Sequence, residues 1–213
     1  MFFLGHMAWA YVLAMMFAGK RRGKLFIPAV LALGVMPDVD ILLQDFGVVH
    51  HTFTHSYFLW LVMFAPFLLV FGRKLIPYFA AVAQHFGFGD FLVGKVMLFW
   101  PFSPLYFGFY LTMPSTLDIA FETAGLLLAA GVLYFSGDLK RLLSVDERNI
   151  LMFIPFLALV TSMLFYAVDW PFIPLVAHIG SSPLLATLVL AHVVLTIFLA
   201  ASTAQGLRRL FNK

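Results

Sequence analysis

Cysteine is absent from this 213-residue chain, and charged side chains are scarce. The absence of cysteine excludes disulfide bonds and thiolate metal sites, so any bound metal must be held by imidazole and carboxylate groups. Charged residues make up only 11% of the chain, whereas soluble domains contain about 25%. Hydrophobic residues make up 63%. These proportions predict a polytopic membrane protein.

Seven apolar stretches each approach the roughly 20 residues that a membrane-spanning helix requires. They cover about residues 1–19, 25–44, 55–72, 75–99, 118–136, 150–168 and 183–203. We therefore expect an all-α fold, a membrane helical bundle of about seven transmembrane helices that forms a single domain over 1–213. The stretch Trp170–Ser182, with Pro171, Pro174 and Gly180, is expected to be re-entrant or interfacial.

The distribution of basic residues predicts the orientation of these helices. Of the 13 Lys and Arg residues, all but Lys95 follow the first, third, fifth or seventh stretch. The positive-inside rule assigns that side to the cytoplasm, which places the N-terminus outside and the C-terminus inside the cell membrane. The net charge of +3 is thus explained by topology, and we expect membrane lipids, not nucleic acid, as partners.

With this orientation, acidic and imidazole side chains gather on the extracytoplasmic side. They are His6, Asp38, Asp40, His50, His51, His55, His85, Asp90, Asp118 and Glu122. Ionisable groups inside a membrane are rare and usually functional. Imidazole and carboxylate suit zinc, and also manganese or iron, and several helices of a bundle can supply ligands together. The pattern predicts a site for divalent metal, zinc first, with two or three ions as an option.

Each of these residues also has a purely structural interpretation. Pro37 and Asp38 could end one helix and cap the next, and His6 could be an ordinary core histidine. Asp118 could stabilise a helix N-terminus. Lys95, predicted to lie inside the fourth stretch, either faces a polar cavity or reaches out to the membrane interface.

The order of these residues resembles a known family. His6 is followed by Pro37-Asp38-Val39-Asp40, by His50 and Thr54-His55-Ser56, by His85 and Asp90, and by Gly94 and the Leu98–Ser103 run. This set resembles the YdjM-like family of membrane-bound metal-dependent hydrolases, over about residues 1–125, with 126–213 as additional transmembrane helices. That family is distantly similar to zinc-dependent phospholipase C and P1-type nucleases, helical proteins that cleave phosphodiesters at a three-zinc site.

The resemblance implies metal ligands at His6, Asp38, His55, His85 and Asp90. It implies that Asp40 and His50 are ligands or orient ligands.

Two positions depart from the family pattern. His51 stands where the family has Arg, and His85 and Asp90 are five residues apart where the family has four. On a regular α-helix a five-residue spacing turns two side chains about 140° apart. Gly87 and Gly89 lie between them and could permit a π-bulge or a break in the helix.

The expected function is hydrolysis of a phosphoester, in a lipid or lipid-linked substrate, by metal-bound hydroxide. Asp38 or Asp40 would orient or deprotonate the water, and Lys95 would stabilise phosphoryl charge. His51, Lys95 and Glu122 are candidates for contact with the substrate. Two alternatives stay open: a metal-ion or proton transporter, and a non-catalytic metal-binding membrane protein. The cytoplasmic halves of the stretches contain few polar residues, which favours an outward-facing site over a transport pathway.

Overall fold

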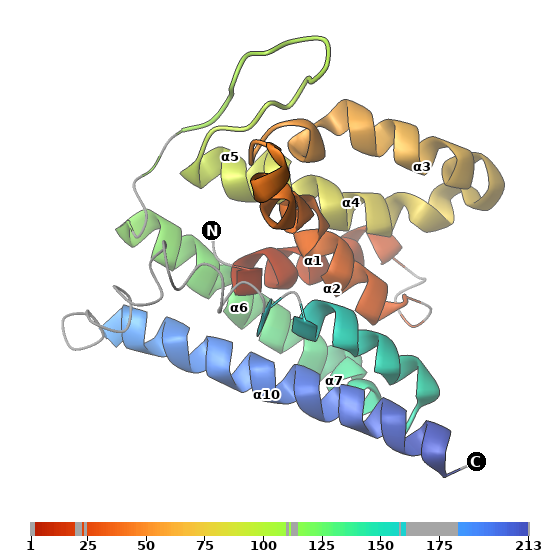
Figure 1. Cartoon of the computed structure of the whole chain (residues 1–213). Coiled ribbons are helices and arrows are strands. Elements are labelled where there is room, and N and C mark those ends of the chain that lie inside the picture. The colour runs from red at the N-terminus through yellow and green to blue at the C-terminus, as the bar shows by residue number, and fades with distance from the viewer. Residues whose placement is uncertain are drawn as a thin grey trace. The chain divides into compact units, whose positions relative to one another are not determined.

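The described part of the chain is entirely helical apart from its loops. The computed structural model describes residues 3–19, 23, 25–109, 111, 115–157, 159–160 and 183–212. Within these residues β structure is limited to one isolated bridge between Val96 and Phe107. The chain divides into two compact units, Met1–Asp118 and Ile119–Lys213 (Figure 1). The all-α prediction is therefore confirmed, and the motif-bearing region predicted over 1–125 contains the whole first unit.

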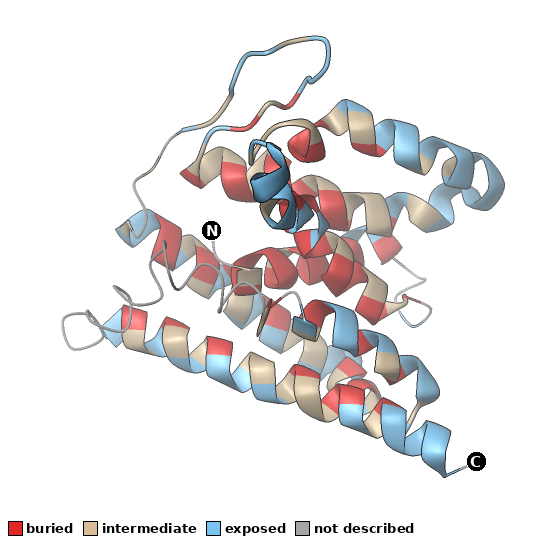
Figure 2. Cartoon of the chain, viewed as in Figure 1, coloured by how far each residue is buried: buried red, intermediate tan, exposed pale blue. Residues whose placement is uncertain are grey.

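Three apolar helices form the centre of the first unit. Helices α1 (Phe3–Ala18), α2 (Ile27–Val35) and α4 (Ile76–Gln84) pack against one another, and Figure 2 shows how much of α1 and α2 is buried. A Cβ atom at Gly34 of α2 would lie 2.6 Å from Ala10 Cβ and 3.1 Å from the His6 carbonyl oxygen. Glycine at this position therefore permits the close approach of α1 and α2.

Helices α3 and α4 form an antiparallel hairpin. Helix α3 (Tyr57–Phe71) leads through the short turn η4 (Gly72–Leu75) into α4, and Gly72 adopts a φ of 56°. The Tyr57 and Phe86 rings are 4.8 Å apart and the Phe64 and Phe79 rings 5.4 Å apart, as antiparallel pairing requires. The apolar stretch Tyr57–Val93 thus folds back on itself.

Tighter and wider turns interrupt the helices where polar residues occur. Helix α2 continues as the 3₁₀ helix η2 (Met36–Phe46), which is followed by the short η3 (Phe53–His55). Helix α4 continues as a π-helical turn, η5 (His85–Gly89), and then as α5 (Asp90–Val93). This turn is the π-bulge that Gly87 and Gly89 were expected to permit. It accommodates one additional residue between His85 and Asp90.

The second unit contains α6 (Thr116–Ser136) from Ile119 onward, α7 (Asp138–Leu142), η6 (Glu147–Met152) and α10 (Pro183–Phe211). The Asn149 amide donates hydrogen bonds to the carbonyl oxygens of Leu142 and Ser144, at 3.1 and 2.8 Å. Ser202 of α10 also donates to the Leu142 oxygen, at 2.6 Å. These bonds satisfy carbonyl groups at the end of α7 that have no partner within the helix.

Four stretches are long and apolar enough to cross a membrane. They are Ile27–Phe46, Tyr57–Val93, Thr116–Ser136 and Pro183–Phe211, and α1 is a shorter apolar helix. These helices are compatible with a membrane protein. The number of seven spans and the orientation of the termini stay predictions. Residues 158 and 161–168 of the span expected over 150–168, and all of Trp170–Ser182, lie outside the described residues.

Replacement of Gly34 by alanine should destabilise the protein, because the new Cβ would meet Ala10 Cβ at 2.6 Å. Overpacking of this kind typically lowers the free energy of unfolding by about 1–3 kcal/mol. Gly131→Ala in α6 is the matched control, since a Cβ there meets nothing within 4 Å; it should be neutral or stabilising by up to about 1 kcal/mol. Thermal unfolding in detergent measures both, and equal melting temperatures would contradict the close approach of α1 and α2.

Candidate metal centre

Two carboxylates and two imidazoles meet in the interior of the first unit. Asp38, His55, His85 and Asp90 are all buried, and each offers one ligand atom within 4.8 Å of the others. We call these four residues the donor cluster. They come from η2, η3, η5 and α5, so four separate segments must fold together to form it.

The closest atoms of the donor cluster are imidazole nitrogens and carboxylate oxygens. His85 Nε2 lies 3.1 Å from Asp38 Oδ1 and 3.0 Å from Asp90 Oδ2. His55 Nε2 lies 3.1 Å from the same Asp90 oxygen and 3.5 Å from Asp38 Oδ1. The π-helical turn is what brings His85 and Asp90 together, because a regular helix would direct them apart.

The backbone of α2 determines which nitrogen of His85 faces the donor cluster. His85 Nδ1 is 2.8 Å from the Gly34 carbonyl oxygen. A carbonyl oxygen only accepts hydrogen bonds, so Nδ1 carries the proton, and in the neutral ring Nε2 presents its lone pair. The neighbouring Gln84 amide donates to the His6 carbonyl oxygen at 2.9 Å. These two bonds fix the position of His85 against α1 and α2.

Asp40 contacts the Nδ1 atoms of two of the histidines. Asp40 Oδ1 accepts a hydrogen bond from His50 Nδ1 at 2.8 Å, and Oδ2 accepts one from the Thr54 hydroxyl at 2.5 Å. The same Oδ2 lies 3.4 Å from His55 Nδ1. A carboxylate on the far nitrogen of a metal-binding histidine fixes the ring and makes its other nitrogen more basic. Asp40 fits that supporting role for His50 and His55.

His6 lies on the other side of His85. The two rings are stacked with centroids 3.7 Å apart, and His6 Nε2 is 3.2 Å from Asp90 Oδ1. The structure thus places His6 next to Asp90 and His85, as the sequence led us to expect, although the four-residue donor cluster does not include it.

Several buried polar atoms of this site have no hydrogen-bond partner. They are His55 Nε2, His85 Nε2, Asp90 Oδ2 and, beside them, His6 Nδ1. A buried polar atom without a partner destabilises the fold by about 1–3 kcal/mol, and more when it is charged. A divalent cation within the donor cluster would contact His55 Nε2, His85 Nε2 and Asp90 Oδ2 together. The donor cluster could therefore hold a metal ion, and its donor types suit zinc, manganese or iron.

Two further histidines make the site accessible. His50 and His51 keep 23% and 28% of their side chains exposed, whereas His55 and His85 are fully buried. His50, His51 and His55 form a second group of close ligand atoms, and Asp38, Asp40 and His50 form a third. His51 has a backbone φ of 65°, which is uncommon for residues other than glycine. The site thus opens on the side of His50 and His51.

His51 is electrically neutral at neutral pH. Burial lowers its pKa to about 4, and the neighbouring His50 and His55 also oppose protonation, while Asp90 favours it. The neutral His51 ring can therefore donate one hydrogen bond and accept another, and it carries no positive charge.

Lys95 and Glu122 are two further predicted site residues. Helix α5 ends at Val93, and Lys95 is exposed in the segment that follows, so the prediction that Lys95 lies inside a helix is wrong. Glu122 is buried in α6, in the second unit, and Asp118 is buried near the start of the same helix. The three groups of His, Asp and Glu ligand atoms found among the described residues do not contain Glu122.

Other residues support the site without having been recognised in the sequence. Gly34 accepts the hydrogen bond from His85, and Gln84 links α4 to α1. Gln84 had a detectable signal, because it is a polar residue directly before His85 in an otherwise apolar helix. Gly34 had none, since its contribution is a carbonyl group that every residue carries.

Comparison of the chain with family models, with curated proteins and with solved structures found no match. The functional interpretation therefore depends on the geometry of the donor cluster and the residues around it.

Replacement of Asp40 by asparagine should weaken metal binding without abolishing it. Asparagine keeps the size of the side chain but lacks the negatively charged carboxylate whose two oxygens accept hydrogen bonds from His50 and Thr54. Loss of such a supporting carboxylate typically lowers metal affinity about 10–100-fold. Asp45→Asn is the matched control, because Asp45 is exposed in the same helix η2. Titration against a competing zinc chelator measures both, and equal affinities would show that Asp40 does not orient the site.

Proposed function

We propose that this protein is a membrane-embedded, metal-dependent hydrolase that cleaves a phosphoester in a lipid or lipid-linked substrate. The observation that carries the proposal is the convergence of buried, unpartnered acceptor atoms from Asp90, His55 and His85. Partly exposed histidines lie next to them. A buried donor set with one accessible side is typical of catalytic metal sites, which keep a position open for water or substrate.

The residues that would hold the ion are Asp38, His55, His85 and Asp90. His6 and His50 are close enough to join them if a second or third ion binds. We expect zinc, because the set combines imidazole nitrogen with carboxylate oxygen. When bound, such an ion polarises a phosphoryl oxygen and lowers the pKa of a nearby water.

The chain itself supplies a base and a hydrogen-bond donor. Both oxygens of Asp40 already accept hydrogen bonds, and Asp40 is 0% exposed, whereas Asp38 is 9% exposed. We therefore assign to Asp38, not Asp40, the role of orienting the attacking water and taking its proton. The neutral His51, at the accessible side, would donate to a phosphoryl oxygen of the substrate.

The apolar character of the helices supports a substrate that is itself membrane-bound. The first unit contains Ile27–Phe46 and Tyr57–Val93, two of the stretches that could cross a membrane, and both carry residues of the donor cluster. The predicted orientation would make the site accessible from the extracytoplasmic side of the cell membrane. The order of His6, Asp38, His55, His85 and Asp90 along the chain supports the same family of reactions.

Purified protein should hydrolyse at least one member of a panel of phospholipids and phosphodiesters, and a chelator should abolish the activity until zinc is restored. Asp38→Asn and His85→Ala should each lower the rate by more than about 100-fold, beyond the range for residues that only support ligands. His192→Gln is the control for loss of a buried histidine, because His192 lies in α10, in the second unit, and its Nδ1 donates to the Leu188 carbonyl oxygen at 2.8 Å.

Unchanged turnover in Asp38→Asn and His85→Ala would refute the assignment of the site. Binding of metal without turnover of any substrate in the panel would instead favour a non-catalytic or transporting metal protein.

A further inference from the structure

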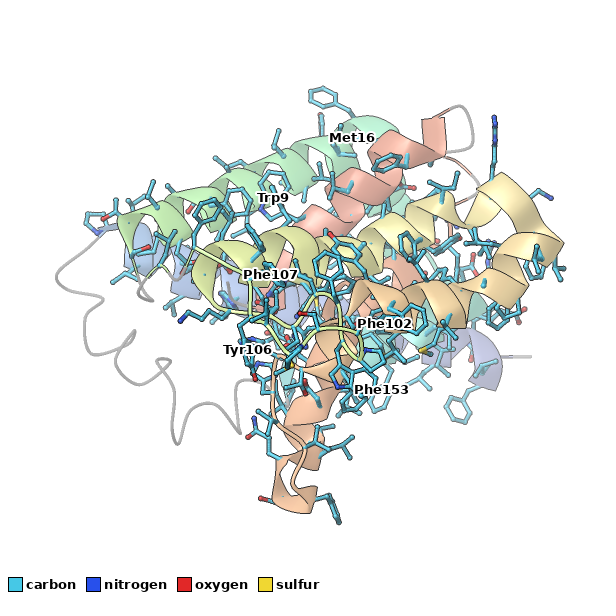
Figure 3. All side chains as sticks on the ribbon, turned by 90° about the horizontal axis from the view of Figure 1, so that it is seen from above. Trp9, Met16, Phe102, Tyr106, Phe107 and Phe153 are labelled. Carbon is cyan, nitrogen blue, oxygen red and sulfur yellow. The ribbon has the colours of Figure 1, made fainter. Side chains whose placement is uncertain are left out.

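An exposed aromatic surface follows α5. Between Val96 and Leu117 the sequence has no charged residue. The part over 99–109, which we call the aromatic segment, exposes Phe99, Trp100, Phe102, Leu105, Tyr106 and Phe109. Phe102 is 74% exposed. Figure 3 labels Phe102, Tyr106 and Phe107 on this segment, and in Figure 1 it belongs to the loop that extends from the end of α5.

The aromatic segment is held by the residues at its two ends, Val96–Leu98 and Phe107–Gly108, which we call its base. Val96 and Phe107 exchange two backbone hydrogen bonds of 2.9 Å. Val96 and Leu98 are buried in a core cluster with Trp60 and Phe86, and Phe107 packs against that cluster. A Cβ at Gly108 would overlap the Gly94 carbonyl oxygen, and Gly108 has a φ of 154°, so the two strands of the loop approach as only glycine permits. The exposed rings are therefore presented by an ordered base.

The same base is fastened to the loop that carries the site histidines. The Met97 N–H donates to the His51 carbonyl oxygen at 3.0 Å, and the Tyr57 N–H donates to the Leu98 oxygen at 3.0 Å. The Ser56 hydroxyl, next to His55, donates to the Trp100 carbonyl oxygen at 2.6 Å. The level of the aromatic segment relative to a membrane therefore determines the level of His51 and His55.

Neither water nor hydrocarbon is a suitable surrounding for this segment. Contiguous exposed apolar surface is unusual in water and marks an interaction site. Non-helical backbone facing lipid does not occur in the hydrocarbon region, because its polar groups would lack partners. The headgroup layer provides both apolar and polar contacts, and Trp and Tyr are enriched there. Lys95, exposed next to the base of the segment, is the kind of residue that extends its ammonium group to that layer.

We propose that the aromatic segment inserts into the lipid headgroup layer of the bilayer and anchors the accessible side of the donor cluster at that level. The stretches that precede and follow it along the chain, Tyr57–Val93 and Thr116–Ser136, are both long and apolar enough to cross a membrane. The proposal goes beyond the proposed hydrolysis and is independent of turnover, since it concerns only where the segment lies.

Engineered cysteines can test this directly, because the natural chain has none. Phe102→Cys and Tyr106→Cys replace exposed residues, so the fold should be kept. Each variant is labelled with a nitroxide and reconstituted into vesicles of phosphatidylcholine and phosphatidylglycerol. Two control variants give the reference values. Ser144→Cys, at an exposed position in the polar stretch after α7, reports on water. Leu127→Cys, at an exposed position in the middle of α6, reports on hydrocarbon.

The readout is the accessibility of each label to oxygen, which concentrates in lipid, and to chromium oxalate, which stays in water. Labels at 102 and 106 should show values intermediate between the two controls for both reagents. Values equal to those at 144 would place the segment in water, and values equal to those at 127 would place it in hydrocarbon. Protection from both reagents would show that protein covers it. Each of these three results would overturn the proposal.

Discussion

Burial of carboxylate oxygens close to imidazole nitrogens is the constraint on which the first unit depends. Asp38 and Asp90 point carboxylate oxygens at His55 Nε2 and His85 Nε2 across 3.0–3.5 Å. The proton on His85 Nδ1 is donated to the Gly34 carbonyl oxygen, so only a second proton or a cation can lie between His85 Nε2 and these carboxylates. In an apolar interior, acceptors that face one another without a proton or cation destabilise the fold. The four segments therefore pack stably only with positive charge between them, and metal binding would contribute to folding itself.

Local departures from regular helix geometry position the residues of this site. The π-helical turn His85–Gly89 adds the residue that brings His85 and Asp90 to one place, at the expense of a regular α-helix. Gly34 lets α2 approach α1 and at the same time offers its carbonyl oxygen to His85. The aromatic segment is bonded to His51 and to Ser56 beside His55. A few backbone contacts thus connect the packing of α1 against α2, the position of His85 and the position of the aromatic segment.

Much of this arrangement could be predicted from the sequence, for a physical reason. In a chain with 11% charged residues, each buried Asp or His needs compensation, so His6, Asp38, His55, His85 and Asp90 were conspicuous, and the structure brings them together. Gly87 and Gly89 indicated that the helix could widen between His85 and Asp90, and it does.

Other features depend on contacts that a linear pattern does not contain. Asp38 and Asp40 are two residues apart, and only their surroundings assign one to the donor cluster and the other to His50 and Thr54. Helix α5 ends at Val93, and Val96 then pairs with the distant Phe107. The sequence does not reveal this pairing, and so the prediction that Lys95 lies inside a helix is wrong.

The central claim is that Asp38, His55, His85 and Asp90 bind a divalent metal, and elemental analysis of purified protein tests it most directly. Wild-type protein prepared without chelators should contain at least one zinc-like ion per chain. Asp38→Asn and His85→Ala, each folded and monodisperse, should lose it. Protein that carries no metal after such a preparation, or variants that retain the full amount, would contradict the account and leave protons as the only compensation for these buried groups.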